Sequence, residues 1–153
     1  MRLLVALERG LLGGLMAGIA IVTFLQVVLR YLFGVPLAWS EELGRFLLVW
    51  LTFIGAGVLV RLPDGHPAVD TLPQALPGRA RYVVERASRL LVIVACVAMG
   101  WGGARMTQVQ WTQTSPSLEL SMGMVYLCIP VGAVLGVLWG VGILLRKPEI
   151  NGA

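Results

Sequence analysis

The side chains best suited to chemistry in this chain are three charges in a short connector, Glu41, Glu42 and Arg45. Two carboxylates can act as a general acid and base when both reach one substrate. Adjacent residues on a helix point about 100° apart, so Glu41 and Glu42 cannot share such a site. We expect Glu41 to pair with Arg45 one helical turn later, at the start of a helix on a membrane surface. Anchoring of a partner subunit is the functional alternative for these charges.

The single histidine, His66, lies near Asp64 and Asp70 in a proline-rich segment and could suggest a metal site. The spacing matches no ligand motif, so turn formation or docking to another protein is the favoured interpretation. Cys96 and Cys128 fall in apolar segments without a Cys-x-x-Cys pattern or a histidine partner. The chain has no nucleotide-binding loop, nucleophile elbow or zinc motif. We predict no catalytic, cofactor or metal site.

Composition indicates which elements position these residues. Apolar residues make up 58% of the chain and charged residues 13%, whereas a soluble domain carries about 25% charged residues. About 20 helical residues cross a hydrocarbon core of ~30 Å. Four segments therefore qualify as transmembrane helices: 10–30, 41–60, 88–109 and 122–145. The sequence predicts a single all-α domain over 1–153, with an interfacial connector between the first two helices.

The third segment is the least apolar of the four. Its charge-free stretch, 90–104, is short for a span. It reaches full length when Arg89 and Arg105 extend their charged ends to the two interfaces. We expect this extension to keep the helix in the membrane.

Basic residues are unevenly divided between the two sides that four spans create. One side carries nine of them and the other carries three. The first set is Arg2, Arg9, Arg61, Arg79, Arg81, Arg86, Arg89, Arg146 and Lys147, and the second is Arg30, Arg45 and Arg105. The positive-inside rule then places both termini in the cytoplasm. We attribute the net charge of +4 to this topology rather than to nucleic-acid binding.

The N-terminus does not have the pattern of a cleavable signal. Arg2 and Arg9 suggest a basic leader, but Glu8 interrupts it and no small-residue cleavage site follows the long apolar run. We expect the first span to be retained.

Several residues mark where the helices begin, end and bend. Gly34 and Pro36 end the first helix. Ser40 is placed to cap the second helix, and Trp39 suits the membrane interface. Pro130 is expected to kink the fourth helix near its start.

Glycines recur at a spacing of four on the first and fourth spans. Small residues on one face let two membrane helices approach closely, since lipid provides no hydrophobic reason for them to associate. We predict that both stripes are packing faces, although membrane helices are also rich in glycine generally. The stripes are Gly10, Gly14 and Gly18 on the first span, and Gly132, Gly136 and Gly140 on the fourth.

Ionisable residues are missing from the middle of every predicted span. Ion-coupled carriers place a charged group or a broken helix at mid-depth. Gln26 and Thr52 are the main polar side chains within the first two spans, and we expect both to form hydrogen bonds between helices. A carrier that works alone is therefore disfavoured.

Taken together, these motifs resemble the small membrane subunit of the tripartite ATP-independent periplasmic (TRAP) transporters. The family has four spans and a connector with Arg-Tyr, an aromatic residue, Pro, Trp, paired Glu and Arg. The matching residues are Arg30, Tyr31, Phe33, Pro36, Trp39, Glu41, Glu42 and Arg45. A small-residue patch, a basic residue and His-x-x-x-Asp end its second span, and Tyr and Ile-Pro begin its fourth. Here these are Gly55, Ala56, Gly57, Arg61, His66, Asp70, Tyr126, Ile129 and Pro130, with Pro67 where the family often has an aliphatic residue.

The resemblance implies a non-catalytic role in the bacterial inner membrane. In this family a large membrane transport subunit carries substrate and sodium, and a periplasmic substrate-binding protein delivers the substrate, typically an organic acid. The small subunit braces the scaffold of the large one. The resemblance places its motif residues at the partner interface, namely Arg30, Tyr31, Trp39, Glu41, Glu42, Arg45, His66 and Asp70.

Two other classes of function remain as alternatives. A self-contained small multidrug-type exporter could dimerise through the glycine faces, but it would need a membrane-embedded glutamate where the first span has only Gln26. A membrane enzyme would need a catalytic constellation, and the sequence contains none.

Overall fold

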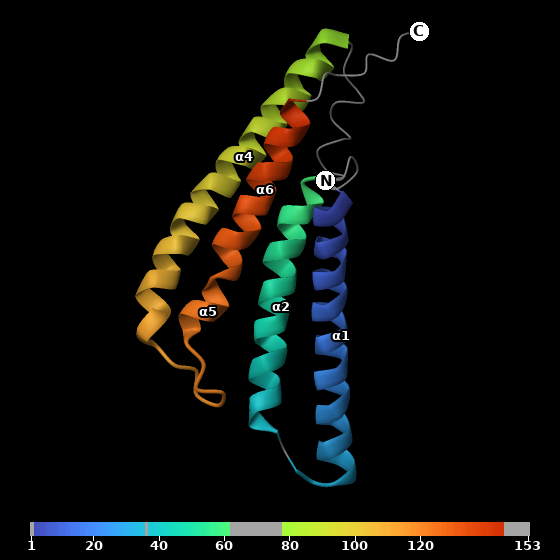
Figure 1. The fold of residues 1–153 in the computed structure, drawn as a ribbon, viewed down its shortest axis with the longest axis vertical. Coiled ribbons are helices and arrows are strands. Elements are labelled where there is room, and N and C mark those ends of the chain that lie inside the picture. Colours follow the sequence, from blue (N-terminus) through green and yellow to red (C-terminus); the bar gives the residue numbers. More distant parts are fainter. Residues whose placement is uncertain (1, 36, 62–77, 146–153) are drawn as a thin grey trace.

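The computed structural model describes residues 2–35, 37–61 and 78–145 of the chain. Four long or interrupted helices account for most of these residues (Figure 1). The elements are α1 (Arg2–Leu32), α2 (Ala38–Leu59), α4 (Gly78–Val109), the 3-10 turn η1 (Gln110–Thr112), α5 (Met122–Tyr126) and α6 (Cys128–Leu144). The predicted fold class, an all-α membrane protein, is confirmed, and a helix covers each of the four predicted spans.

Three segments in the described part of the chain are long and apolar enough to cross a membrane. They are Leu3–Leu32, Ala38–Leu59 and Met122–Leu144, the last of which joins α5 to α6. The predicted span 88–109 lies in α4, which is not among the three. The charge-free part of α4, 90–104, is shorter than the ~20 residues that a span requires.

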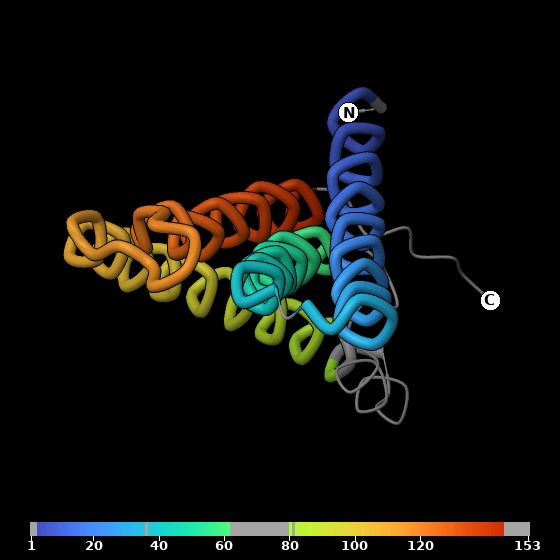
Figure 2. Tube along the Cα trace, turned by 90° about the horizontal axis from the view of Figure 1, so that it is seen from below, coloured from blue at the N-terminus to red at the C-terminus, as the bar shows by residue number. Residues whose placement is uncertain are grey.

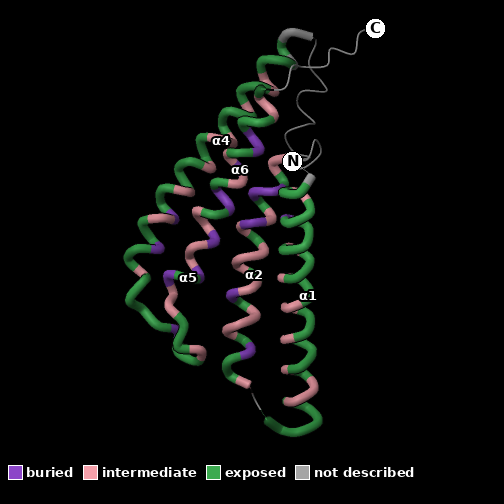
Figure 3. The backbone as a smooth tube through the Cα atoms, in the orientation of Figure 1, coloured by how far each residue is buried: buried purple, intermediate pink, exposed green. Residues whose placement is uncertain are grey.

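The helices are arranged with α2 between α1 and the pair formed by α4 and α6 (Figures 1 and 2). Among the described elements, the backbone of α1 packs against α2 alone, whereas α6 packs against both α2 and α4. The buried residues follow this arrangement and gather along α2 and α6, while α1 is mostly exposed (Figure 3). The core is small, with Ile54 and Cys128 fully buried. Apolar side chains facing outward are expected for a protein whose surroundings are lipid.

The connector between α1 and α2 turns at Gly34, as predicted. Gly34 has a φ of +69°, a left-handed conformation that glycine adopts without a steric penalty. The N–H of Val35 then reaches back to the carbonyl of Leu29, 3.1 Å away. The left-handed conformation of Gly34 and this hydrogen bond let the chain reverse direction within a few residues.

The prediction that Ser40 caps α2 is wrong. The helix begins earlier, with Leu37 in the cap position, and no side chain provides a cap hydrogen bond there. The Ser40 hydroxyl instead donates to the Leu37 carbonyl at 2.7 Å and is 1% exposed. Because this hydroxyl is used as a donor to the Leu37 carbonyl, it does not cap the first N–H groups of the helix.

The predicted kink at Pro130 stays a prediction. Helix α5 ends at Tyr126 and α6 begins at Cys128, so a single residue, Leu127, separates the two helices. Leu127 keeps a right-handed helical conformation, and its N–H bonds to the Gly123 carbonyl at 3.0 Å. Proline lacks the N–H that would bond to the carbonyl four residues earlier, and its ring crowds that carbonyl, so a local irregularity is expected just before it.

Candidate functional site

The loop between α4 and α5 forms a closed turn over residues 113–121. The N–H of Glu119 bonds to the Ser115 carbonyl at 3.2 Å, and the N–H of Met122 bonds to the Gln113 carbonyl at 2.8 Å. Ser115 is buried, and its hydroxyl accepts from the N–H of Leu120 at 3.3 Å. These bonds leave the N–H groups of Ser117 and Leu118 at the turn of the loop, where they are available to an acceptor outside the loop.

Glu42 supplies that acceptor from the first turns of α2. Its Oε2 accepts the N–H of Ser117 at 3.0 Å and the N–H of Leu118 at 2.8 Å. Hydrogen bonds to an ionised acceptor are stronger than those between neutral groups. The contact joins positions 75 and 76 residues apart, so it fastens the loop to the connector end of the bundle. Glu42 is a structural clamp in this geometry, with one oxygen committed to two backbone donors.

Glu41 takes part in a different contact from the one predicted. Its Oε1 accepts from Gln26 Nε2 of α1 at 3.3 Å, and within the described residues it forms no ion pair with Arg45. The prediction for Gln26 as a link between helices is confirmed, and the prediction of a Glu41–Arg45 pair is wrong. Thr52 was also expected to bridge helices, but its hydroxyl donates to the Leu48 carbonyl of its own helix at 2.8 Å.

The other motif residues of the connector face outward. Arg30 lies exposed in the last turn of α1, and Arg45 is exposed on α2. Tyr31 is 79% exposed and Trp39 is 37% exposed. His66 and Asp70 lie outside the described residues. The start of α2 thus carries Trp39, Glu41, Glu42 and Arg45. Of these, Glu42 is bonded to the 113–121 loop and Glu41 to Gln26 of α1.

The glycine stripe of α6 lies against its two neighbours. A Cβ on Gly132 would collide with the backbone carbonyl of Phe53, and one on Gly57 of α2 would collide with the carbonyl of Gly132. A Cβ on Gly136 would stand 2.7 Å from Cys96 Sγ, and one on Gly140 would stand 2.7 Å from a side-chain carbon of Ile93. The missing side chains allow α2, α4 and α6 to approach closely.

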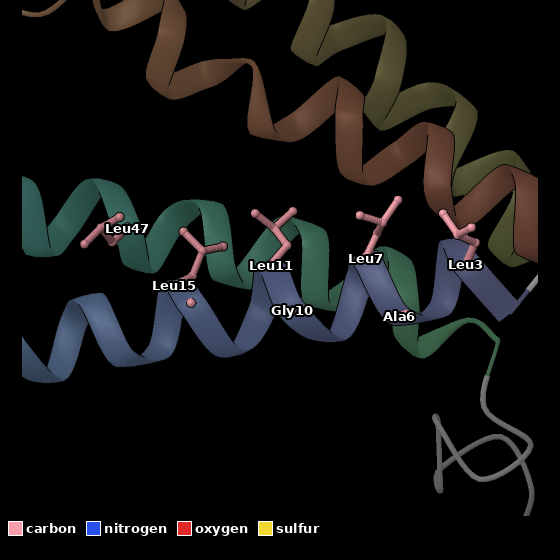
Figure 4. Close-up of a pocket in the computed structure, with 8 residues that line it drawn as sticks. Leu3, Ala6, Leu7, Gly10, Leu11, Leu15 and Leu47 are labelled. Atoms are coloured by element: carbon pink, nitrogen blue, oxygen red, sulfur yellow. The ribbon is translucent and has the colours of Figure 1, made fainter.

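The glycine stripe of α1 has different surroundings. A Cβ added at Gly10 or Gly14 would meet nothing within 4 Å, and one at Gly18 would only touch Leu47 at 3.4 Å. Gly10 and Gly14 border an apolar groove, in which leucines of α1 point to one side and Leu47 is contributed by α2 (Figure 4). The lining residues are Leu3, Ala6, Leu7, Gly10, Leu11, Gly14, Leu15 and Leu47. This face of α1 has no occupant among the described residues.

A buried polar cluster at the opposite end from the connector was not predicted. Glu8 is 5% exposed, and its Oε1 accepts from Trp139 Nε1 at 2.7 Å. The guanidinium carbon of Arg61 lies 5.1 Å from the centre of the Trp139 ring, within reach of a cation–π interaction. The cluster joins α1 to α6, two helices whose backbones do not touch. In the sequence, a single acidic residue near the start of an apolar helix could have indicated a buried polar contact. Its partner could not be identified, because Trp139 lies 131 residues away and meets Glu8 only in the folded chain.

Within the described residues, this arrangement binds helices together and does not assemble reactive groups. No three His, Cys, Asp or Glu side chains of these residues come together as metal ligands. Cys96 and Cys128 are free cysteines among the packed helices. Four features remain for a functional interpretation: the hydrogen bonds of Glu42 to the loop, the buried cluster around Glu8, the glycine stripe of α6 that is packed against α2 and α4, and the glycine stripe of α1 that has open space beside it.

Comparison with known proteins gives a consistent result. Residues 19–148 match the family described as tripartite ATP-independent periplasmic transporters, DctQ component. A TRAP transporter small permease relative from Haemophilus influenzae is 31% identical over 111 residues, which are 72% of this chain and 67% of the relative. The C4-dicarboxylate TRAP transporter small permease protein DctQ of Rhodobacter capsulatus is 32% identical over 104 residues, 67% of this chain and 45% of that protein.

One similar protein is much longer than this chain. The isethionate TRAP transporter permease protein DctMQ of Oleidesulfovibrio alaskensis is 29% identical over 130 residues, which cover 79% of this chain but 20% of that protein. A segment similar to this chain therefore occurs there within one large permease polypeptide.

Proposed function

Because this chain belongs to the DctQ component family of the tripartite ATP-independent periplasmic transporters, we propose that it braces the large subunit of a sodium-driven symporter. In this proposal the chain is one four-helix, non-catalytic domain in the bacterial inner membrane. The large membrane subunit carries an organic acid with sodium, and a periplasmic substrate-binding protein delivers that acid. The relative in which a similar segment is part of a longer permease supports a large membrane partner. The C4-dicarboxylate named in another relative supports a carboxylate substrate.

The main support for the bracing role is that only one of the two glycine stripes is packed against other helices of the described chain. The stripe on α6 is filled by the chain's own helices, whereas Gly10 and Gly14 on α1 have open space and a groove beside them. A glycine in a helix interior costs about 1 kcal/mol relative to alanine. A glycine face toward lipid alone recovers none of this cost, but one that receives another helix does. We propose that the α1 stripe packs against the large subunit.

The exposed motif residues are the second part of the proposed interface. Glu42 fastens the 113–121 loop and so keeps the start of α2 in one position. Arg30, Tyr31, Trp39, Glu41 and Arg45 would contact the partner from this connector, and so would His66 and Asp70, which follow α2 in the sequence. Charges at a membrane interface are partly desolvated, so a partner that pairs with them gains more than it would at an open surface.

Reconstitution tests the proposed function. We expect the purified chain alone, in liposomes, to move no organic acid under a sodium gradient. Liposomes that also contain the large subunit, with the binding protein and a C4-dicarboxylate added, should show sodium-dependent uptake. Uptake by the isolated chain would overturn the proposal and favour a self-contained exporter of the small multidrug type. Stable co-purification of the large subunit is the control that separates failed assembly from a wrong substrate.

Topology is tested separately. The nine-to-three division of basic residues supports cytoplasmic termini. Reporter fusions after Ala153 and within the loop at Ser117 should therefore report opposite sides of the membrane. Signals from the same side would remove the four-span arrangement.

A further inference from the structure

Helix α4 carries a pair formed by an aromatic residue and an arginine toward each of its ends. The guanidinium carbon of Arg86 lies 5.0 Å from the centre of the Tyr82 ring, and that of Arg105 lies 5.5 Å from the Trp101 ring. In both pairs the arginine follows the aromatic residue by one helical turn, and both arginines are exposed. A ring below the flat face of a guanidinium group leaves its in-plane N–H donors free to bind an anion.

The spacing of the two pairs matches a bilayer. Each pair is separated from the other by 19 residues, from 82 to 101 and from 86 to 105. At ~1.5 Å per residue this is about 28 Å, close to the ~30 Å hydrocarbon core. Tyrosine, tryptophan and arginine all favour the headgroup region. The two pairs therefore suit opposite membrane faces, and they would hold a helix with a short charge-free stretch across the lipid.

The two ends differ in charge. Residues 78–89 contain four arginines and one glutamate, a net charge of +3, whereas residues 101–121 contain one arginine and one glutamate, a net charge of 0. Glu85, the single acid of the first segment, is half-buried and engaged in an interaction of its own. Arg86 and Arg89 are exposed beside the exposed side chains of Tyr82 and Val83. Basic and apolar groups together are the composition that binds an anionic membrane surface.

We propose that the first turns of α4, from Gly78 to Arg89, bind the headgroup of an anionic phospholipid. The Arg86 and Arg89 guanidinium groups donate to the lipid phosphate, and Tyr82 and Val83 contact the glycerol and upper acyl region. The pair at the other end, Trp101 and Arg105, anchors the helix without selecting for anionic lipid, because no further basic residue lies near it in the sequence. This site is independent of the transported substrate and of the large subunit.

Native mass spectrometry of the full chain, titrated with dioleoyl phosphatidylglycerol or dioleoyl phosphatidylcholine, tests the proposal. The wild type should retain phosphatidylglycerol in preference to phosphatidylcholine. The double substitution Arg86→Gln with Arg89→Gln should lower this affinity by roughly thirtyfold, from about 1 kcal/mol per arginine. The matched control Arg105→Gln, which removes the same kind of stacked arginine, should leave the preference unchanged. Arg86→Lys with Arg89→Lys keeps the charge and should retain most of the binding.

Three results would overturn the proposal. One is equal retention of the two lipids by the wild type, and another is an equal loss of phosphatidylglycerol in the Arg105→Gln variant. The third is unchanged lipid retention in the double variant with weaker capture of the large subunit, which would assign the segment to an acidic protein surface. Matching circular dichroism and thermal unfolding of all variants would show that a loss of lipid binding is not a loss of fold.

Discussion

Helices α6 and α1 carry glycines at the same spacing but in opposite surroundings. On α6, an added Cβ at Gly132, Gly136 or Gly140 would stand against α2 or α4 at less than contact distance. On α1, an added Cβ at Gly10 or Gly14 would enter open space. The difference follows from position in the bundle: among the described helices, the backbone of α6 packs against both α2 and α4, whereas that of α1 packs against α2 alone. A small-residue stripe thus indicates where a backbone can approach, but the fold decides whether the approaching helix belongs to the same chain.

The largest loss of stability is expected for a substitution at Gly132, in the packed stripe of α6. In Gly132→Ala, the new methyl group would meet the backbone carbonyl of Phe53, which cannot move without shifting α2. Overpacking of this kind costs about 1–3 kcal/mol or more. We expect a clear fall in the unfolding temperature of the purified chain in detergent. Gly142→Ala on the same helix, where nothing lies within 4 Å, is the matched control and should change little. Equal unfolding temperatures would show that the α6 stripe is not tightly packed.

A second test asks whether α1 is held by a polar contact in place of a packed glycine stripe. Trp139→Phe removes the N–H that donates to Glu8 and leaves a buried carboxylate without this partner. Loss of a partner for a buried group costs about 1–3 kcal/mol. Thermal unfolding should show this loss, and exposed Trp101→Phe should not.

The double variant Glu8→Leu with Trp139→Phe refines that test. It removes both partners, so it should be less destabilised than the sum of the two single variants. Strict additivity would mean that the Glu8–Trp139 contact contributes nothing to holding α1.

A smaller effect is expected at the Glu42 clamp, which holds the loop at the other end of the bundle. Glu42→Ala removes both hydrogen bonds to Ser117 and Leu118, which are only partly shielded from solvent. We expect a loss of about 1 kcal/mol and faster proteolysis within residues 113–121. Glu41→Ala, which removes one longer bond to Gln26, is the comparison. Equal proteolysis of the two variants would show that the clamp does not order the loop.

The smallest loss of stability in the isolated chain is expected for a substitution at Gly14, in the unpacked stripe of α1. The same substitution tests whether that stripe binds the large subunit. Gly14→Leu has free space around it, so the unfolding temperature should stay within the range of Gly142→Leu. Its capture of the large subunit should nevertheless fall, because leucine separates the two backbones. Gly136→Leu should lower both stability and capture. If Gly14→Leu captured the large subunit as well as Gly142→Leu does, the α1 stripe would be incidental.

The turn at Gly34 could be predicted from the sequence, because the φ preference of glycine acts at a single residue. The cap of α2 could not, because the helix begins at Ala38 and leaves Ser40 inside its first turn. The choice of partners was predicted less well. Glu41 was expected to bond within its helix and instead meets Gln26, whereas Thr52 was expected to bond between helices and bonds within its own. Both errors concern side chains that could find a hydrogen-bond partner either within their own helix or on a neighbouring one: a donor for the Glu41 carboxylate and an acceptor for the Thr52 hydroxyl.

Apolar runs and small residues follow local rules of length and spacing, so the membrane class, the approximate positions of the spans and the two glycine stripes could be predicted from the sequence. That Glu42 fastens a loop 75 residues away, and that Glu8 is buried against Trp139 of α6, depends on the fold. The fold also decides that one stripe is packed and the other open. These outcomes depend on which helices lie side by side. Lipid gives apolar helices no hydrophobic reason to prefer one neighbour over another, so close packing and a few buried polar contacts decide the arrangement.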